Sequence, residues 1–247
     1  MSEVKIKNHL LDHGRKLFKA KKTFSDFTGI KEADVLLNDI DNYPHAFVIG
    51  CVMDRQMRAE LAWAIPYRFL EKLDHFDLPK LAKLSQSQVY KLMTKPEPLH
   101  RFPDEMSNNF HQAIKKIKNE YKGDASIIWN NTPSSAEVVY RFMQFRGVGP
   151  KIATMAANIL ARDFKIKFSD YYSIDISVDV HVRRVFRRLG LVPDKVSTDE
   201  LIYKARALYP DFPGLMDLPA WEIGRNWCKP KQPLCDDCYM GKLCPSN

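Results

Sequence analysis

The chain has 247 residues, of which 45% are hydrophobic, and this is enough sequence for one large domain or two lobes with a buried core. No apolar run reaches the roughly 18 residues of a membrane span, and the N-terminus lacks a signal-peptide pattern. We therefore expect a cytoplasmic protein, associated with the nucleoid if prokaryotic, that is neither secreted nor membrane-bound. The net charge of +8 suits an anionic partner, and nucleic acid is the first candidate.

Helical periodicity runs through most of the chain, and convincing alternating strands are absent. Pro66 is expected to kink or break the helix predicted at 54–73, and a proline-rich stretch at 95–104 is expected to form a loop. The sequence therefore predicts an all-α fold. The predicted helices lie near residues 10–18, 54–73, 78–94, 108–121 and 135–145.

A glycine turn follows the last of these helices. Gly147-Val148-Gly149 makes a tight turn, and Pro150 can open the next helix at its first position, where its missing N–H does no harm. Backbone N–H groups at such a helix start can bind a phosphate. A plain turn between two helices explains the same glycines equally well.

A second helix start is expected at Asp179, where apolar residues begin to recur at helical spacing. Asp179 is a natural N-cap, and Gly190 can end the helix. By default His181 is a structural residue, and the arginines that follow it form an exposed basic face. These arginines are Arg183, Arg184, Arg187 and Arg188.

Four of the five cysteines crowd into the last twenty residues, with gaps of six, two and five residues between them. They are Cys228, Cys235, Cys238 and Cys244. Only one pair forms the short knuckle that zinc sites use twice, so a compact loop around a [4Fe–4S] cluster is the first interpretation. Zinc and disulfides remain alternatives, although a reducing compartment disfavours disulfides. The fifth cysteine, Cys51, lies in an apolar stretch and is expected to be a core residue.

Taken together, the glycine hairpin, the Val-Asp-x-His-Val segment and the cysteine spacing resemble the endonuclease III branch of the helix-hairpin-helix (HhH-GPD) DNA glycosylases. The resemblance covers about residues 142–244 and is weaker before them. It implies two helical lobes: a six-helix barrel with the hairpin at 32–160, and a cluster lobe built from 1–31 and 161–247. Duplex DNA with a damaged base or abasic site would be the partner of a monomeric enzyme, with the target base flipped out of the stack.

The resemblance also implies roles for individual residues. Asp179 would stabilise the positive charge that develops on the sugar as the base leaves, and its N-cap hydrogen bonds would keep it ionised. Lys151 would attack C1′ and form a Schiff base that permits strand cleavage, which requires a lowered pKa of its amine. Members without this lysine usually only remove the base. The cysteines would hold a structural cluster.

The same resemblance implies the DNA contacts. The N–H groups of Gly147, Val148 and Gly149 would bind phosphates, and Gln56 resembles a glutamine that fills the gap left by the flipped base. An ordinary exposed helix residue is the alternative for Gln56. Further phosphate contacts are expected from the cluster-loop lysines Lys229, Lys231 and Lys242.

Two departures from the family pattern stand out. Lys151 and Asp179 are 28 positions apart, which is longer than usual, and the excess at 163–177 is rich in aromatic and β-branched residues that suggest a small hairpin. Val180 stands where threonine is common.

The sequence thus predicts a base-excision-repair glycosylase with lyase activity, acting on an oxidised or deaminated base, first of all a pyrimidine. The alternatives are a monofunctional glycosylase of the same fold, for instance one that removes a mispaired base, and a non-catalytic module that scans DNA.

Overall fold

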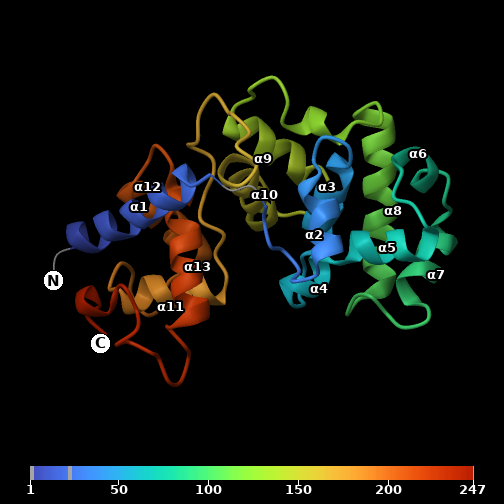
Figure 1. The fold of residues 1–247 in the computed structure, drawn as a ribbon. Coiled ribbons are helices and arrows are strands. Elements are labelled where there is room, and N and C mark those ends of the chain that lie inside the picture. The colour runs from blue at the N-terminus through green and yellow to red at the C-terminus, as the bar shows by residue number, and fades with distance from the viewer. Residues whose placement is uncertain (1–2, 22–23, 247) are drawn as a thin grey trace. The chain divides into compact units, whose positions relative to one another are not determined.

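The computed structural model describes residues 3–21 and 24–246, and in this part of the chain every regular element is a helix (Figure 1). The prediction of an all-α fold is therefore confirmed. None of the described helices is both long and apolar enough to cross a membrane. The α-helices are α1 (Glu3–Lys19), α2 (Lys31–Asn38), α3 (Pro44–Met53), α4 (Ala59–Trp63), α5 (Ile65–Leu73), α6 (Leu78–Leu81), α7 (Gln86–Thr94), α8 (Pro103–Glu120), α9 (Ser135–Met143), α10 (Pro150–Arg162), α11 (Val180–Arg188), α12 (Thr198–Leu208) and α13 (Asp217–Asn226). The 3-10 helices are η1 (Ala125–Ile128), η2 (Pro213–Met216) and η3 (Gly241–Leu243).

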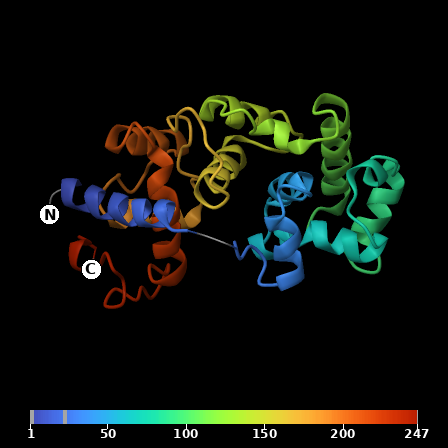
Figure 2. The ribbon, with the colours of Figure 1, turned by 45° about the horizontal axis from the view of Figure 1, so that its top comes forward.

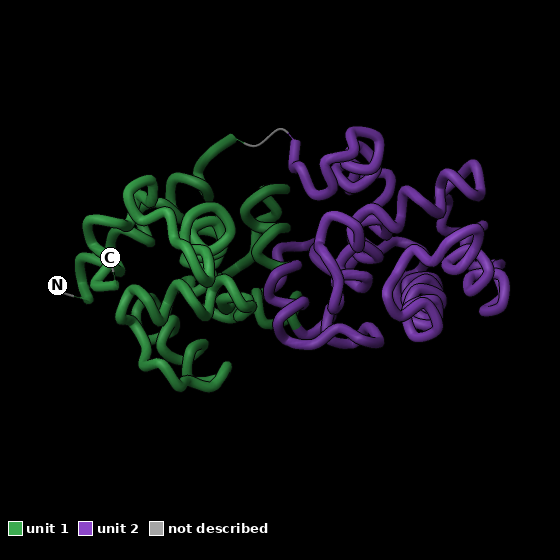
Figure 3. Tube along the Cα trace, turned by 90° about the horizontal axis from the view of Figure 1, so that it is seen from below, with its two compact units in different colours: residues 1–21, 134–139, 157–247 green, residues 22–133, 140–156 purple. Residues whose placement is uncertain are grey.

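The chain folds into two compact units (Figure 3). Unit 1 contains residues 1–21, 134–139 and 157–247, and unit 2 contains 22–133 and 140–156. Helices α9 and α10 each contribute residues to both units. The predicted division into 32–160 and the remainder, with a six-helix barrel in the first part, stays a prediction. Its ranges include residues 1–2, 22–23 and 247, which lie outside the described residues.

Unit 2 is built around α3. All ten residues of this helix are buried, as expected for a helix that is apolar on every side. Phe47 of α3 packs edge-on against Trp129 and Phe142, and Phe69 stacks on Phe110 with ring centroids 4.2 Å apart. Cys51, also on α3, has no exposed surface, so the expected core position of this cysteine is confirmed. Burial raises the pKa of its thiol well above the usual value.

Unit 1 brings the N-terminal helix against elements from the end of the chain. Figure 2 shows α1 beside α13, more than 190 residues later in the sequence, and α1 also contacts η2. Gly14 of α1 permits this contact, because a Cβ atom there would lie within 2.1 Å of the Leu215 carbonyl oxygen. Helices α11 and α13 pack together even more extensively.

The structure corrects several predicted elements. Residues 54–58 are not helical. The rest of the predicted helix is broken at Ala64, two residues before Pro66, which lies in the first turn of α5, so the expected break at this proline is confirmed. The predicted helix at 78–94 is two helices, separated by a turn that ends at the capping box of Ser85. Helix α8 begins at Pro103, five residues earlier than predicted.

The 163–177 segment contains no strand, so the suggested hairpin is wrong. Several of its aromatic and β-branched residues pack in unit 1 instead of against a partner strand: Phe168, Ile174 and Ile176 are buried, and Tyr171 stacks on Phe212 with centroids 4.9 Å apart, whereas Tyr172 is exposed. Tertiary burial explains the same composition that suggested a strand.

Candidate functional site

The glycine turn lies between α9 and α10, in unit 2. Gly147 has φ of +85°, a conformation that favours glycine, and a Cβ atom there would lie 2.6 Å from Asn109 Nδ2 and 2.9 Å from Arg55 Nη1. Gly149 differs, because a Cβ atom there would meet nothing within 4 Å. The fold therefore requires glycine at position 147, whereas at position 149 glycine leaves the backbone open to an external group.

Polar side chains connect this turn to the loop at 54–58. Arg146 Nε donates to Asn109 Oδ1 at 3.1 Å, and Arg55 Nη1 donates to Glu105 Oε1 at 2.6 Å. Asn109 and Glu105 are one turn apart on α8, so this helix supports both loops. Gln56, between these contacts and α4, is exposed and has φ of +51°. Its position in a loop rules out the alternative of an ordinary helix residue.

Lys151 is the second residue of α10 and is exposed. Behind it, Thr154 Oγ1 donates to the carbonyl oxygens of Pro150 and Lys151, at 2.9 and 3.1 Å. Ile152, Ala156 and Ile159, at helical spacing on the same helix, are buried. Lys151 therefore projects from the solvent-facing side of a well-packed helix start.

Asp179 belongs to unit 1 and is the N-cap of α11, as predicted. Its Oδ1 accepts hydrogen bonds from the backbone N–H groups of His181 and Val182, both at 2.8 Å. Its Oδ2 accepts no hydrogen bond in the part of the chain that the structure describes. One carboxylate oxygen is thus fixed by the helix start, and the other remains available.

The four clustered cysteines line one small cavity that is partly open to solvent. Apolar side chains, among them Val185, Leu189 and Ile223, form much of the remaining wall. Burial raises the pKa of the Cys238 and Cys244 thiols, and the N–H groups of Met240 and Ser246 act in the opposite direction on these two sulfurs. Among the described residues, no group of three or more His, Cys, Asp or Glu side chains has the arrangement that holds a metal ion.

Two arginines of α11 hold the cysteine loop in place. Arg184 donates to the carbonyl oxygens of Cys228 and Gly224, at 2.6 and 2.8 Å. Arg188 donates to the carbonyl oxygens of Lys229 and Pro230 and lies 3.3 Å from Cys228 Sγ. The prediction of an exposed basic face is therefore wrong for these two residues, because the loop folds back onto α11 and its carbonyl groups need donors.

The three lysines predicted as phosphate contacts are all exposed: Lys229, Lys231 and Lys242. Lys229 Nζ donates to the carbonyl oxygen of Arg225, so this ammonium already has one partner. The other two lie in the cysteine loop and in η3. Nothing in their packing requires a lysine.

Comparison with known proteins identifies the family of this chain. The profile of a family described as "HhH-GPD superfamily base excision DNA repair protein" matches residues 49–211, about two thirds of the chain. The chain belongs to this HhH-GPD superfamily. The matched range contains Lys151 and Asp179 and ends before the four cysteines.

Two curated relatives of this HhH-GPD protein are both called Endonuclease III. The protein of Thermotoga maritima is 30% identical over 152 residues, which are 61% of this chain and 64% of the relative. The protein of Synechocystis sp. is 29% identical over 148 residues, which are 57% of this chain and 55% of the relative. Each match spans less than two thirds of the relative's length.

Solved structures show the same fold along the whole HhH-GPD chain. A trapped covalent endonuclease III–DNA intermediate matches with a TM-score of 0.64 at 19% identity, covering 100% of this chain and 97% of the other. A thermostable thymine-DNA glycosylase matches with a TM-score of 0.65 at 17% identity, covering 98% and 96%. At these identities the likeness concerns the fold alone.

One further residue near Asp179 is not apparent in the sequence pattern. Asp217, the first residue of α13, is buried, and its Oδ1 accepts the Ser177 N–H at 2.6 Å. Burial, with the charge of Asp179, raises the pKa of Asp217 to about 6, against the opposing effects of the Ser177 N–H and Arg162. In the sequence, the only signal for Asp217 is that of an acidic residue in the first turn of a helix.

Proposed function

We propose that this protein is a DNA glycosylase with an associated abasic-site lyase activity, acting on a damaged base in duplex DNA. Oxidised or deaminated pyrimidines are the first substrates to test. The observation that carries the proposal is the state of Asp179: one oxygen is bound by two backbone N–H groups, and the other is unengaged. Membership in a base excision repair family and two relatives called Endonuclease III support it.

Recognition of DNA would begin at the hairpin. The start of α10 offers N–H groups and the positive end of a helix dipole, which together attract a phosphate. Gly149 has no neighbour where a side chain would be, so a nucleic-acid backbone can approach closely there. Gln56, exposed in its loop, would occupy the space that the flipped base leaves.

Base removal breaks the bond between C1′ and the base nitrogen, and positive charge grows on the sugar. A fixed carboxylate stabilises that charge without having to reorganise during the reaction. Asp179 Oδ2 is the atom that would face the sugar, because Oδ1 is occupied by the α11 backbone. The departing base takes the electron pair of the broken bond and is protonated.

Strand cleavage would follow from attack by an amine. The neutral Nζ of Lys151 forms a bond to C1′, and opening of the sugar ring then gives a protonated imine. Loss of a C2′ proton expels the 3′ phosphate by β-elimination. Hydrolysis of the imine returns the lysine. The exposed position of Lys151 at the start of α10 supports this assignment.

Borohydride trapping on a panel of lesion-bearing duplexes tests the proposal, because borohydride reduces only an imine to a stable crosslink. We expect the wild-type protein to give a crosslink with at least one oxidised or deaminated pyrimidine, and Lys151→Ala to give none. Base release without any crosslink would instead identify a monofunctional glycosylase. Binding with neither product would identify a scanning module and contradict the proposal.

We also propose that the four cysteines hold one [4Fe–4S] cluster. Four thiols that line one cavity suit a body with several iron atoms. The apolar wall and the N–H groups beside two of the sulfurs are of the kind that surrounds such clusters. When bound, the cluster would provide a rigid structural crosslink, with Arg184 and Arg188 holding the loop around it.

A further inference from the structure

The chain that leads to Asp179 is fastened along its length within unit 1. We refer to residues 174–178 as the strap. Ile174 and Ile176 are buried, and Asp175 accepts two hydrogen bonds from Arg206 of α12, both at 2.8 Å. The Ile174 carbonyl oxygen accepts the Gly214 N–H at 2.7 Å. The strap is therefore an ordered segment, although it has no regular secondary structure.

The turn from η2 into α13 holds the strap at its two ends. Gly214 N–H binds Ile174, and three residues later the Asp217 carboxylate binds the Ser177 N–H at 2.6 Å. A Cβ atom at Gly214 would lie 2.7 Å from the Ile174 carbonyl oxygen, so only glycine allows this approach. The last contact precedes Asp179 by two residues.

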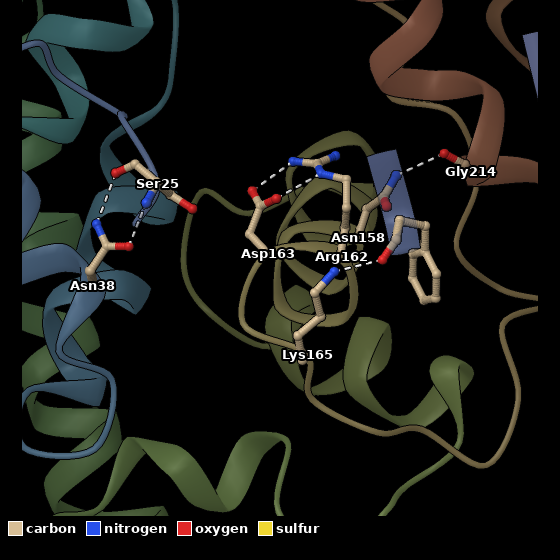
Figure 4. Close-up of polar contacts among 8 residues, drawn as sticks. Ser25, Asn38, Asn158, Arg162, Asp163, Lys165 and Gly214 are labelled. Carbon is tan, nitrogen blue, oxygen red and sulfur yellow. Dashed lines mark hydrogen bonds and ion pairs between the residues drawn. The ribbon is translucent and has the colours of Figure 1, made fainter. Parts of the chain in front are cut away.

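The same turn is also bonded to α10. The Asn158 side chain, buried within unit 1, donates to the Gly214 carbonyl oxygen at 2.9 Å, and Figure 4 shows this bond from the helix to the turn. Arg162, one turn later on α10, is bound to Asp163 by two hydrogen bonds. Gly214 thus connects the part of α10 that belongs to unit 1 with the strap that leads to Asp179.

Burying a carboxylate to bind a backbone N–H group costs free energy. Desolvation opposes its charge, and Asp179 adds a second unfavourable negative charge nearby. A backbone carbonyl or an amide could bind Ser177 without this penalty. What the Asp217 side chain provides is an acceptor oxygen at one fixed point of the strap, 2.6 Å from the Ser177 nitrogen.

We propose that Asp217 is a positioning residue, which fixes the backbone of Ser177 so that the Asp179 carboxylate is held at the start of α11 in one orientation. This inference rests on the proposed function, because it assigns Asp217 to the reaction in which Asp179 takes part. Asp217 itself touches no substrate in this scheme. A displacement of a reacting group by about 1 Å can lower a rate on the order of a hundredfold.

The test compares two substitutions at Asp217. Asp217→Leu removes the acceptor, whereas Asp217→Asn keeps an oxygen for Ser177 and removes the charge. The measurements are the single-turnover rate on the best lesion duplex, the Kd for a duplex with a non-cleavable abasic analogue, and hydrogen exchange of the Ser177 amide. We expect Asp217→Leu to lose at least about tenfold in rate, with a Kd close to wild type and fast exchange at Ser177. Asp217→Asn should restore both rate and protection.

Asp34 provides a matched control in unit 2. It is also a buried carboxylate that accepts backbone N–H groups, here from Phe27 and Thr28 at 3.1 and 2.9 Å. Asp34→Asn and Asp34→Leu should leave the rate of the folded protein unchanged. If Asp217→Leu does not fold, Asp217→Glu replaces it, since it moves the acceptor by one methylene and keeps the charge, and it should also be slow.

Three results would overturn the inference: a wild-type rate in Asp217→Leu or Asp217→Glu, an equal loss of rate in Asp217→Asn, or a loss confined to Kd. The hydrogen exchange separates this failure from failure of the proposed function. If the wild-type protein acts on no lesion but Ser177 loses protection only in Asp217→Leu, then Asp217 does hold the Ser177 backbone and the proposed function is wrong.

Discussion

Gly224 of α13 and His181 of α11 are in direct backbone contact. A Cβ atom at Gly224 would lie 2.6 Å from His181 Cβ and 3.0 Å from its Cα. Arg184 bridges the same two residues, because its Nη2 donates to the Gly224 carbonyl oxygen at 2.8 Å and lies 3.0 Å from His181 Nδ1. The first turn of α11, which binds the Asp179 carboxylate, is thereby fixed against the helix that leads into the cysteine loop.

Gly224→Ala should therefore destabilise unit 1. The new methyl group meets backbone atoms of α11, which cannot rotate away, so the two helices must separate at a cost of about 1–3 kcal/mol. Urea unfolding measures this difference. Gly149→Ala is the matched control, because its methyl group would point into open space, and it should change stability by less than about 0.5 kcal/mol. Equal stability of the two variants would contradict the expectation.

The two hairpin glycines should separate stability from DNA binding. Gly147→Ala places a side chain at a positive φ against Asn109 and Arg55, and should destabilise unit 2 by about 1–3 kcal/mol. Gly149→Ala should keep the stability but weaken duplex binding, because its methyl group occupies the space that a phosphate would use. A fluorescence titration measures the Kd for duplex DNA, and urea unfolding measures the stability of each variant. Wild-type affinity in Gly149→Ala would contradict the prediction that the hairpin contacts DNA.

DNA affinity should depend strongly on salt. Contacts through exposed lysines and helix N–H groups release counterions from the phosphates, so log Kd should rise by about 0.9 for each neutralised phosphate per unit of log salt concentration. Replacing Lys231 or Lys242 by Met should reduce that slope by about one phosphate, whereas Lys83→Met, an exposed lysine of unit 2 that follows α6, should not change it. A flat salt dependence would contradict phosphate-dominated binding.

Asp179→Asn should keep the fold and lose base excision. Asparagine is also a good N-cap, so the two N–H bonds at the start of α11 survive and the melting temperature should change little. The charge that would stabilise the sugar cation is absent, and the single-turnover rate should fall on the order of a hundredfold or more. Asp179→Ala is the comparison, since it loses both the cap and the charge and should cost about 1 kcal/mol in addition. A near-wild-type rate in Asp179→Asn would show that Asp179 only caps α11 and has no role in base excision.

Protein purified without oxygen should be yellow-brown, with a broad absorbance near about 400 nm, and should contain about four irons and four sulfides per chain. Cys238→Ala should lose the colour and destabilise the loop. Cys51→Ala is the control, because Cys51 is buried in α3 of unit 2, and it should keep the full colour. Stoichiometric zinc without iron or sulfide would overturn the assignment.

Asp217 should give the stability a distinctive pH dependence. Its pKa is about 6 in the folded protein, raised by burial and by Asp179, and about 3.9 in an unfolded chain. Between these values the folded state binds more protons, so stability falls as the pH rises from about 4 to about 6, by an amount on the order of 3 kcal/mol. Asp217→Asn cannot titrate. The free energy of unfolding of wild type minus that of Asp217→Asn should therefore decrease over this range in urea titrations, and a constant difference would show that the carboxyl group is not desolvated.

Local sequence signals predicted the features that depend on neighbouring residues. The glycine turn, the cap at Asp179 and the end of α11 at Gly190 all follow from backbone preferences that act within a few residues. The apolar run around Cys51 likewise predicted that this cysteine lies in the core, although no helix was predicted there. The all-α class followed because helical periodicity was present in most segments and strand periodicity was not.

Features that depend on distant residues were decided only in the folded chain. The 163–177 segment has the composition of a hairpin, yet its last residues, 174–177, have no regular secondary structure and are bound by Gly214, Asp217 and Arg206, which lie 30 to 40 residues later. The sequence alone predicted exposed positions for Arg184 and Arg188. In the folded chain, both donate hydrogen bonds to carbonyl oxygens of the cysteine loop. Asp217 carries no local signal of its role, because its burial and its partner Ser177 come from packing between segments. Periodicity and caps determine helices through local backbone energies, whereas the position of a buried polar group is determined by which distant partner satisfies it.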